Sequence, residues 1–175
     1  MHVPVPQAVA TLEERGLLKH HKHHHPDQTI EFVGALFGFS LPNDLKDFYR
    51  ARIGSVSGFD AYSPKWNARV GWRDQGRELT RLQHAGSVPL LGDGCGNLWG
   101  LDLASGRAHP PVYFFNHERA FSKPEYTAGS SLGAFLLLVA DEDRAIREDW
   151  PVGWQLATDP DIDKDPRAPP PWAEA

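Results

Sequence analysis

The chain has 175 residues, 41% of them hydrophobic, and a formal net charge of −5, values typical of one globular domain with a substantial core. No apolar run approaches the roughly 18 residues of a membrane span. The N-terminus lacks the pattern of a signal peptide, and the single cysteine excludes an internal disulfide. Composition therefore predicts a soluble, cytoplasmic protein that does not enter a membrane.

The acidic charge is concentrated in the C-terminal half, mostly in residues 141–165. Nucleic-acid binders usually carry a basic patch that neutralises phosphates, and none is evident here, so we expect no direct binding to nucleic acid. An acidic surface favours a basic partner. It serves equally well to keep a protein in solution, and composition alone leaves both interpretations open.

Three amphipathic helices are expected in the first third of the chain, over residues 6–18, 27–37 and 43–53. In each, apolar residues recur at helical spacing. Pro42 stands at the entrance of the third helix, and Gly54 lies just past its expected end. Their apolar faces are expected to form part of the core.

Five histidines fall within the six positions His20 to His25, beside two lysines. Neutral imidazole is the commonest metal ligand, so the run invites a metal hypothesis. A specific metal site needs fixed geometry on ordered elements. Because these histidines are crowded into an expected loop, we expect a solvated connector and no metal.

A meander of strands is expected in the middle of the chain. Residues 55–86 contain a strand or two, and "RELTRLQHA" within them is either a helix or an edge strand. "SVPLLGD" predicts a strand, "NLWGLDL" alternates as a half-exposed strand should, and "PVYFFNH" is rich in strand formers. Short connections between the three predict antiparallel pairing.

The last expected helix covers residues 130–140, "SSLGAFLLLVA", with Ser130 or Ser131 as its cap. Its apolar content on nearly every side predicts a buried helix packed on the sheet. "WPVGW" is expected to be the last anchored segment. Residues 1–154 are then the domain, and the acidic, proline-rich residues 155–175 are expected to be an extended or disordered tail.

The most unusual stretch is "GDGCGNLWGLDL", residues 92–103. Its glycines do not keep the G-x-G-x-x-G spacing of a dinucleotide site, it has no P-loop lysine, and it lacks the ligands of a calcium loop. Cys95 with His109 or His117 as base would make a nucleophile. A tight turn that needs positive φ explains the stretch with fewer assumptions, so no catalytic residue and no cofactor is expected.

The order of these motifs resembles the SUKH superfamily. The resemblance rests on "LPNDLKDFYRARIG", preceded by a helix carrying Glu31, then "VPLLGDGCGNLWGLDL", "PPVYFFNHE" and "SSLGAFLLLV". Together these cover residues 27–140, with Cys95 and Asn97 departing from the common pattern. The motif residues in this chain are Leu41, Pro42, Gly54, Gly94, Gly96 and Trp99.

The resemblance implies a single α+β domain, with a twisted, mostly antiparallel sheet flanked by helices. It also implies binding and not catalysis: bacterial members look like immunity proteins that neutralise a cognate polymorphic toxin domain, often a nuclease. We therefore expect a monomer that binds such a toxin. The acidic residues nearest the matched elements are the candidate partner-binding residues: Asp93, Asp102, Glu118, Asp141, Glu142 and Asp143.

Two alternatives stay open at this stage. A eukaryotic branch of the superfamily resembles regulators of cell-wall synthesis, so a regulatory or scaffold module that binds a cellular protein is the second hypothesis. The third is a hydrolase that depends on Cys95 and a histidine.

Overall fold

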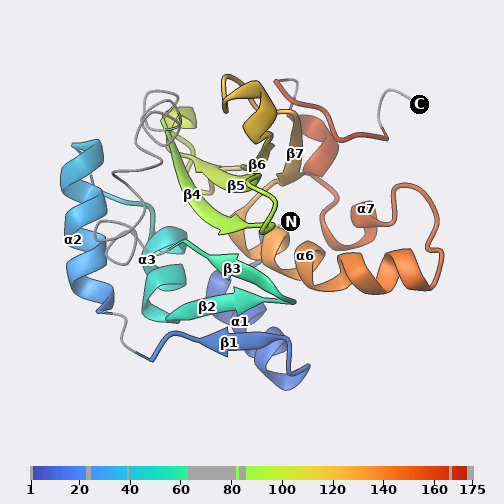
Figure 1. Cartoon of the computed structure of the whole chain (residues 1–175), viewed down its shortest axis with the longest axis horizontal. Coiled ribbons are helices and arrows are strands. Elements are labelled where there is room, and N and C mark those ends of the chain that lie inside the picture. The colour runs from blue at the N-terminus through green and yellow to red at the C-terminus, as the bar shows by residue number, and fades with distance from the viewer. Residues whose placement is uncertain are drawn as a thin grey trace.

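A computed structural model of the chain describes residues 2–22, 25–38, 40–62, 82, 86–165 and 167–172. Its centre is an open, seven-stranded antiparallel sheet in which each strand pairs with the next along the chain (Figure 1). The strands are β1 (Leu18–His20), β2 (Ile53–Val56), β3 (Phe59–Ala61), β4 (Ser87–Gly92), β5 (Leu98–Asp102), β6 (Val112–Phe115) and β7 (Tyr126–Gly129). The expected meander is confirmed in its three central strands.

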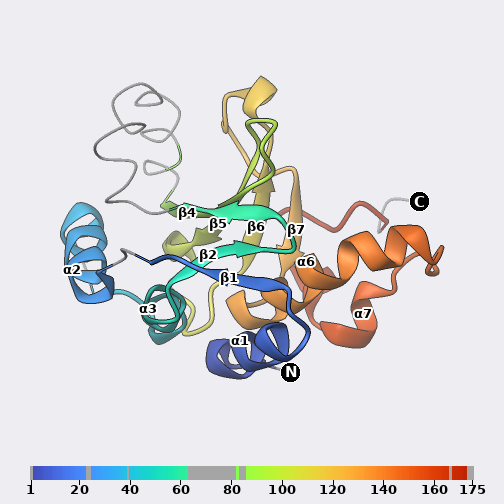
Figure 2. The ribbon, with the colours of Figure 1, turned by 60° about the horizontal axis from the view of Figure 1, so that its bottom comes forward.

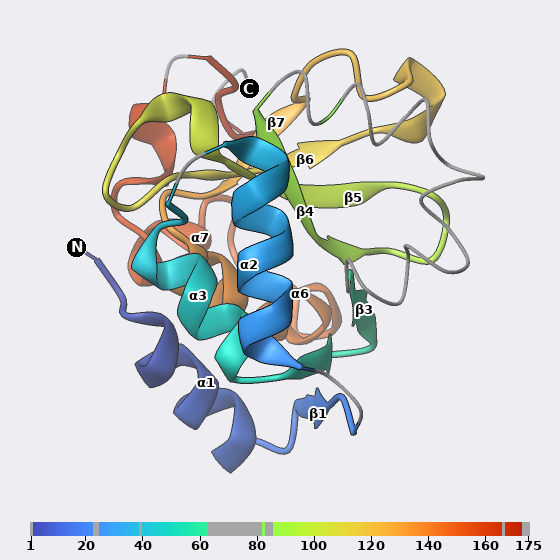
Figure 3. The ribbon, with the colours of Figure 1, turned by 90° about the vertical axis from the view of Figure 1, so that its left-hand side faces the viewer.

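Helices flank this sheet. They are α1 (Val5–Glu14), α2 (Pro26–Phe37), α3 (Asn43–Arg50), α6 (Leu132–Arg147) and α7 (Gln155–Thr158), with 3-10 turns η1 (Leu103–Ser105), η2 (His117–Arg119) and η3 (Ile162–Lys164). Helices α1, α3 and α6 lie beneath one face of the sheet (Figure 2), and α2 stands beside α3 (Figure 3). The expected α+β class, with an antiparallel sheet flanked by helices, is confirmed.

The main core lies between the sheet and α1, α3 and α6. Residues of β5 point alternately to the two faces, and Trp99 and Leu101 enter this core together with Phe48 and Phe135. Leu98 points the other way, into a second cluster with Phe115. All five residues of β5 are buried. The expectation of a half-exposed strand was therefore wrong, because both faces of β5 are covered.

The third helix is shorter than expected. α3 ends at Arg50, and the chain turns at Arg52, whose φ is +53°. Gly54 therefore lies inside β2 and does not end a helix. A Cβ atom at Gly54 would stand 3.0 Å from the carbonyl oxygen of Lys19 on β1. A glycine there lets two strands approach closely, which explains why this position lacks a side chain.

The last long helix is longer than expected. α6 continues past residue 140 to Arg147, and Ala145 in its final turns is buried. Ser131 caps it, its Oγ accepting from the backbone N–H of Ala134 at 3.4 Å. The backbone N–H and Oγ of Ser130 instead donate to the carboxylate of Asp159.

The C-terminal segment is not the extended or disordered tail that its composition suggests. Residues 155–165 include α7 and η3, and Asp159 and Ile162 are buried. Thr127 of β7 donates its backbone N–H to the carbonyl of Ala168 at 2.8 Å. Hydrogen bonds to buried aspartates and to β7 thus compensate for the small number of apolar residues in this segment.

Two expectations lie wholly or partly outside the described residues. Most of "RELTRLQHA" is among them, although Leu82 is described and fully buried against β6. His23 and His24 of the histidine run are also outside. Across the ranges that the structure describes, none of the helices combines the length and the apolar content that crossing a membrane would require.

Candidate functional site

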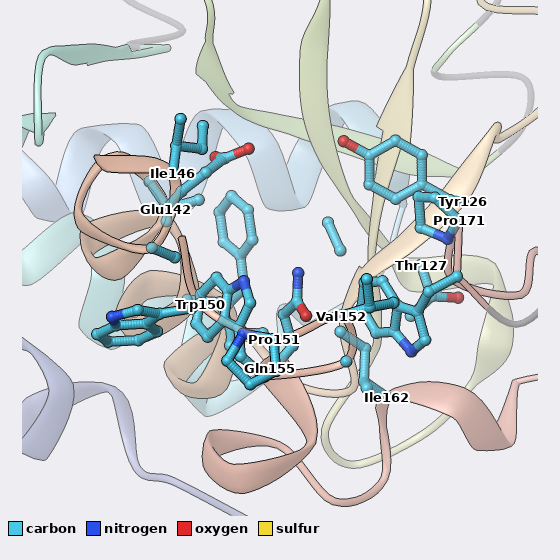
Figure 4. Close-up of a pocket in the computed structure, with 18 of the residues that line it drawn as sticks. Tyr126, Thr127, Glu142, Ile146, Trp150, Pro151, Val152, Gln155, Ile162 and Pro171 are labelled. Atoms are coloured by element: carbon cyan, nitrogen blue, oxygen red, sulfur yellow. The ribbon is translucent and has the colours of Figure 1, made fainter. Parts of the chain in front are cut away.

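A groove of about 510 Å³ opens between the C-terminal half of α6, strand β7 and the segment that follows α6 (Figure 4). We call it the α6–β7 groove. Glu142 and Ile146 stand on one side of it, Tyr126 and Pro171 on the other, and Trp150, Pro151 and Val152 lie below them in this view. Three segments that are distant in sequence thus build one concave surface.

Aromatic side chains dominate the walls of this groove. They are Trp99, Tyr126, Phe135, Trp150, Trp154 and Trp172. Trp99 and Phe135 belong to the main core, so the groove reaches down to it. At the rim, Ile146 is 74% exposed and Val152 is 84% exposed. Large exposed apolar side chains around an aromatic groove are typical of a protein-binding surface.

The polar side chains that line the same groove include Glu142, Asp149 and Gln155. Burial, and then the nearby charge of Asp143, raise the pKa of Glu142 above its ordinary value. Among the described residues, the Oε1 atom of Gln155 is buried without a hydrogen-bond partner. The pKa of Tyr126 is raised too, by burial first and then by the charges of Glu142 and Asp93. The groove therefore combines apolar walls with acidic side chains, and it contains a buried hydrogen-bond acceptor that has no partner among the described residues.

The raised pKa of Glu142 predicts that replacing this residue with glutamine stabilises the protein at neutral pH. The folded state favours the protonated carboxyl, so stability falls as pH rises from the ordinary value of 4.5 through the raised pKa. Glutamine does not ionise and escapes this loss. Thermal unfolding should show Glu142→Gln about 1 to 3 °C above wild type at pH 7, and no difference below about pH 4. An unchanged or lower melting temperature at pH 7 would contradict the burial of this charge.

Asp93 organises the β4–β5 turn. Its Oδ1 accepts from the backbone N–H groups of Cys95 at 2.8 Å and Asn97 at 3.0 Å, and its Oδ2 accepts from the Asn97 side chain. Asn97 in turn accepts from the backbone N–H of His117. Gly94 and Gly96 adopt φ of +77° and +100°. The stretch that drew attention in the sequence is a turn held by side chains, as its glycines predict.

Asp102 is not part of an exposed acidic face. It is only 2% exposed, its Oδ1 accepts from the backbone N–H of Ala104, and its Oδ2 lies 2.8 Å from Nη1 of Arg167. The same guanidinium contacts Asp165, which also accepts from the hydroxyl of Tyr113. We remove Asp102 from the candidate partner-binding residues, because it fastens the C-terminal segment to the sheet.

The other acidic candidates are divided between two places. Glu118 is exposed in η2. Asp141 pairs with Arg15 at 2.7 Å, Asp143 is 78% exposed, and Glu142 lines the α6–β7 groove. Only the last of these joins an apolar pocket, so the structure brings one of the six candidates into the groove.

The remaining motif residues have structural positions. Leu41 is buried in the main core, and Pro42 precedes the first residue of α3. Trp99 is buried between Phe59 and Phe135.

The structure does not support the cysteine hydrolase hypothesis, which requires a histidine paired with Cys95. Cys95 is exposed in the β4–β5 turn. His109 lies elsewhere: its Nδ1 is 2.9 Å from the carboxylate of Asp44, and its ring stacks on His2 at 3.4 Å. His117 bonds through Nδ1 to Asn97. Within the described ranges, the structure gives neither histidine a hydrogen bond to Cys95.

Two places were considered for a metal. Within the histidine run, His20 bonds to the carbonyl of Ala51 and to Glu13. His2, Asp44 and His109 place ligand atoms within 4.8 Å of one another. However, the two rings are stacked with only 22° between their planes. An ion lies near the plane of an imidazole that binds it, so two stacked rings are poorly arranged for shared coordination. Instead, Nδ1 of His109 lies at hydrogen-bonding distance from Asp44, 2.9 Å, and Nε2 of His2 lies 3.7 Å from the same carboxylate.

Sequence reasoning missed most of the α6–β7 groove. Its wall uses residues 150–172, which were assigned to the last anchored segment and a tail. The available signal was three tryptophans, Trp150, Trp154 and Trp172, in a stretch with few other large apolar residues. Isolated tryptophans of this kind are common at binding surfaces.

Comparison with known proteins agrees with this architecture. No curated protein and no solved structure matches the chain. One family model does match, over residues 26–137, which is well over half of the chain and includes α2, α3, every strand from β2 to β7 and the first turns of α6. The chain therefore belongs to the SMI1 / KNR4 family (SUKH-1).

Proposed function

We propose that this chain is a non-catalytic immunity protein that binds and neutralises a cognate toxin domain through the α6–β7 groove. Family membership supports the class, since SUKH domains are commonly immunity proteins. The observation that carries the site is the groove itself, where exposed Ile146 and Val152 line the same surface as Trp150, Trp154 and Trp172. Aromatic side chains that a partner would cover on binding are typical hot spots of a tight protein interface.

The charge of the groove supports a basic partner. Glu142 and Asp149 line it, and Asp143 is exposed on the same helix. A nuclease toxin binds phosphates and so presents a basic cleft, which an acidic surface both attracts and retains. The proposed partner is therefore a nuclease-type toxin domain, bound by one copy of this chain.

The regulatory or scaffold hypothesis uses the same groove for a cellular protein. It differs in outcome, because such a module gives no protection against a toxin. The hydrolase hypothesis is less favoured, since Cys95 and the two histidines lie in separate hydrogen-bond arrangements.

Co-expression tests the proposal. The C-terminal domain of the product of the neighbouring gene is induced alone and then together with this chain. Growth arrest that the chain relieves, with a 1:1 complex on co-purification, is the expected result. Toxicity without rescue, or a harmless neighbour and no complex, would favour the scaffold hypothesis.

A further inference from the structure

The α6–β7 groove contains hydrogen-bond acceptors that have no donor in the part of the chain that the structure describes. Among the described residues, the structure gives no hydrogen bond or ion pair to the side chains of Glu142 and Asp149, and Oε1 of Gln155 is buried without a partner. Figure 4 shows the Gln155 amide standing in the middle of the groove. A buried acceptor left unsatisfied costs free energy, which applies to Oε1 of Gln155. Glu142 is a partly buried carboxylate in the same groove, so both groups are available to an incoming donor.

The neighbouring carboxylate behaves differently. Glu148 accepts from Nε of Arg144 at 3.0 Å and from the indole N–H of Trp150 at 2.9 Å. Its charge is thus already compensated within the protein. Of these unpaired acceptors, Glu142 comes from α6 and Gln155 from α7, while Asp149 is exposed in the segment between the two helices.

The walls favour a planar cation with an aliphatic stem. Trp150, Trp154 and Trp172 present indole rings, and Ile146 and Val152 present apolar surface at the mouth. The protein already uses such a contact at the rim, where Cζ of Arg144 lies 5.3 Å over the ring of Trp150. Guanidinium groups stack on indole faces and are less strongly hydrated than ammonium groups.

We propose that the α6–β7 groove is a receptor for an arginine side chain of the partner protein, with Glu142 and Gln155 as its acceptors and the tryptophans as its walls. Several N–H donors in a fixed fork suit two acceptors on different helices. A lysine would offer a compact ammonium that stacks less well and loses more hydration. This inference rests on the proposed function for the existence of a protein partner, but its test does not require that partner.

The test uses small probes on the full chain. N-acetyl-L-arginine methylamide is titrated into the ¹⁵N-labelled protein at pH 7.5. Binding is measured by NMR from the shifts of the indole N–H resonances. The citrulline and lysine analogues are titrated in parallel, because citrulline keeps the shape and loses the charge. We expect saturable shifts of the Trp150 and Trp154 indoles with arginine, and binding at least fivefold weaker with either analogue.

Two variants sharpen the result. Glu142→Gln should weaken binding of the arginine probe about tenfold, since a charge-assisted hydrogen bond is lost. Glu31→Gln is the matched control: it changes net charge equally, on the exposed face of α2 at the far side of the molecule (Figure 1), and should bind as wild type does.

Equal binding of citrulline, equal binding of lysine, or an arginine affinity insensitive to Glu142→Gln would each overturn the inference. These outcomes are separable from the proposed function. A toxin complex that forms normally with Glu142→Gln preserves the immunity function and removes the arginine receptor. Arginine-specific binding in the groove without a toxin complex would support the arginine receptor and contradict the immunity function.

Discussion

Replacing Ile146 with arginine is expected to weaken the complex with the cognate toxin domain at least 100-fold and to abolish protection, without unfolding the protein. Ile146 is 74% exposed at the rim of the α6–β7 groove, so its removal leaves no cavity. It lies one helical turn after Glu142, and an arginine there can pair with that carboxylate. A cation in the last turn of a helix is also favourable.

The loss of binding has two physical sources. The new guanidinium neutralises the acidic groove and repels a basic partner, and its bulk narrows the entrance. Growth protection and titration calorimetry measure the effect, with urea unfolding as the test of integrity. Ala35→Arg is the matched control, because Ala35 is exposed on α2, away from the groove (Figure 1). An Ile146→Arg protein that still protects fully would place the interface elsewhere.

Replacing Arg167 with methionine is expected to lower the free energy of unfolding by about 2 to 4 kcal/mol. The change removes the cation that pairs with buried Asp102 and leaves buried Asp165 with only the more distant Arg107, at 3.5 Å. Asp102 and Asp165 are 2% and 4% exposed. Burial alone would raise the pKa of Asp165, but hydrogen bonds from Arg167 and Tyr113 outweigh it and lower that pKa. The guanidinium lies 5.3 Å over the ring of Tyr113 as well.

Urea unfolding at pH 7 measures this loss. Part of it should be recovered when Asp102→Asn is added, since an amide needs no counter-charge. Arg50→Met is the control: Arg50 pairs with Asp47 within α3 at the surface, and its loss should change stability little. If Arg167→Met unfolds as wild type does, the C-terminal segment is not fastened to the sheet in this way.

Much of the fold could be predicted because its signals are local. Strand-forming residues and neighbouring turns predicted β4 and β6, and alternation predicted β5. Helical spacing predicted α2, and a serine cap followed by apolar residues predicted the start of α6. Strands β1, β3 and β7 were missed or left unplaced because each has only three or four residues. Such strands are stable only through pairing with neighbours, which no short window of sequence displays.

The candidate site was less predictable because it depends on contacts between distant residues. Charge selected both Asp102 and Glu142, yet Asp102 is neutralised by Arg167 while Glu142 lines an open groove. Composition predicts a disordered C-terminal segment because acidic side chains are usually exposed. In the structure, however, the side chains that anchor this segment include the buried aspartates Asp159 and Asp165. Their partners, Ser130 and Tyr113, are far away in the sequence.

The central claim is that this chain binds its partner through the α6–β7 groove. The most direct test is amide hydrogen exchange, followed by mass spectrometry, on the free chain and on its complex with the proposed toxin domain. We predict slower exchange on binding in peptides that cover residues 142–156 and β7, with no change in α2. Protection confined to the β4–β5 turn, to η2 or to α2, with peptides of the groove unchanged, would contradict the claim.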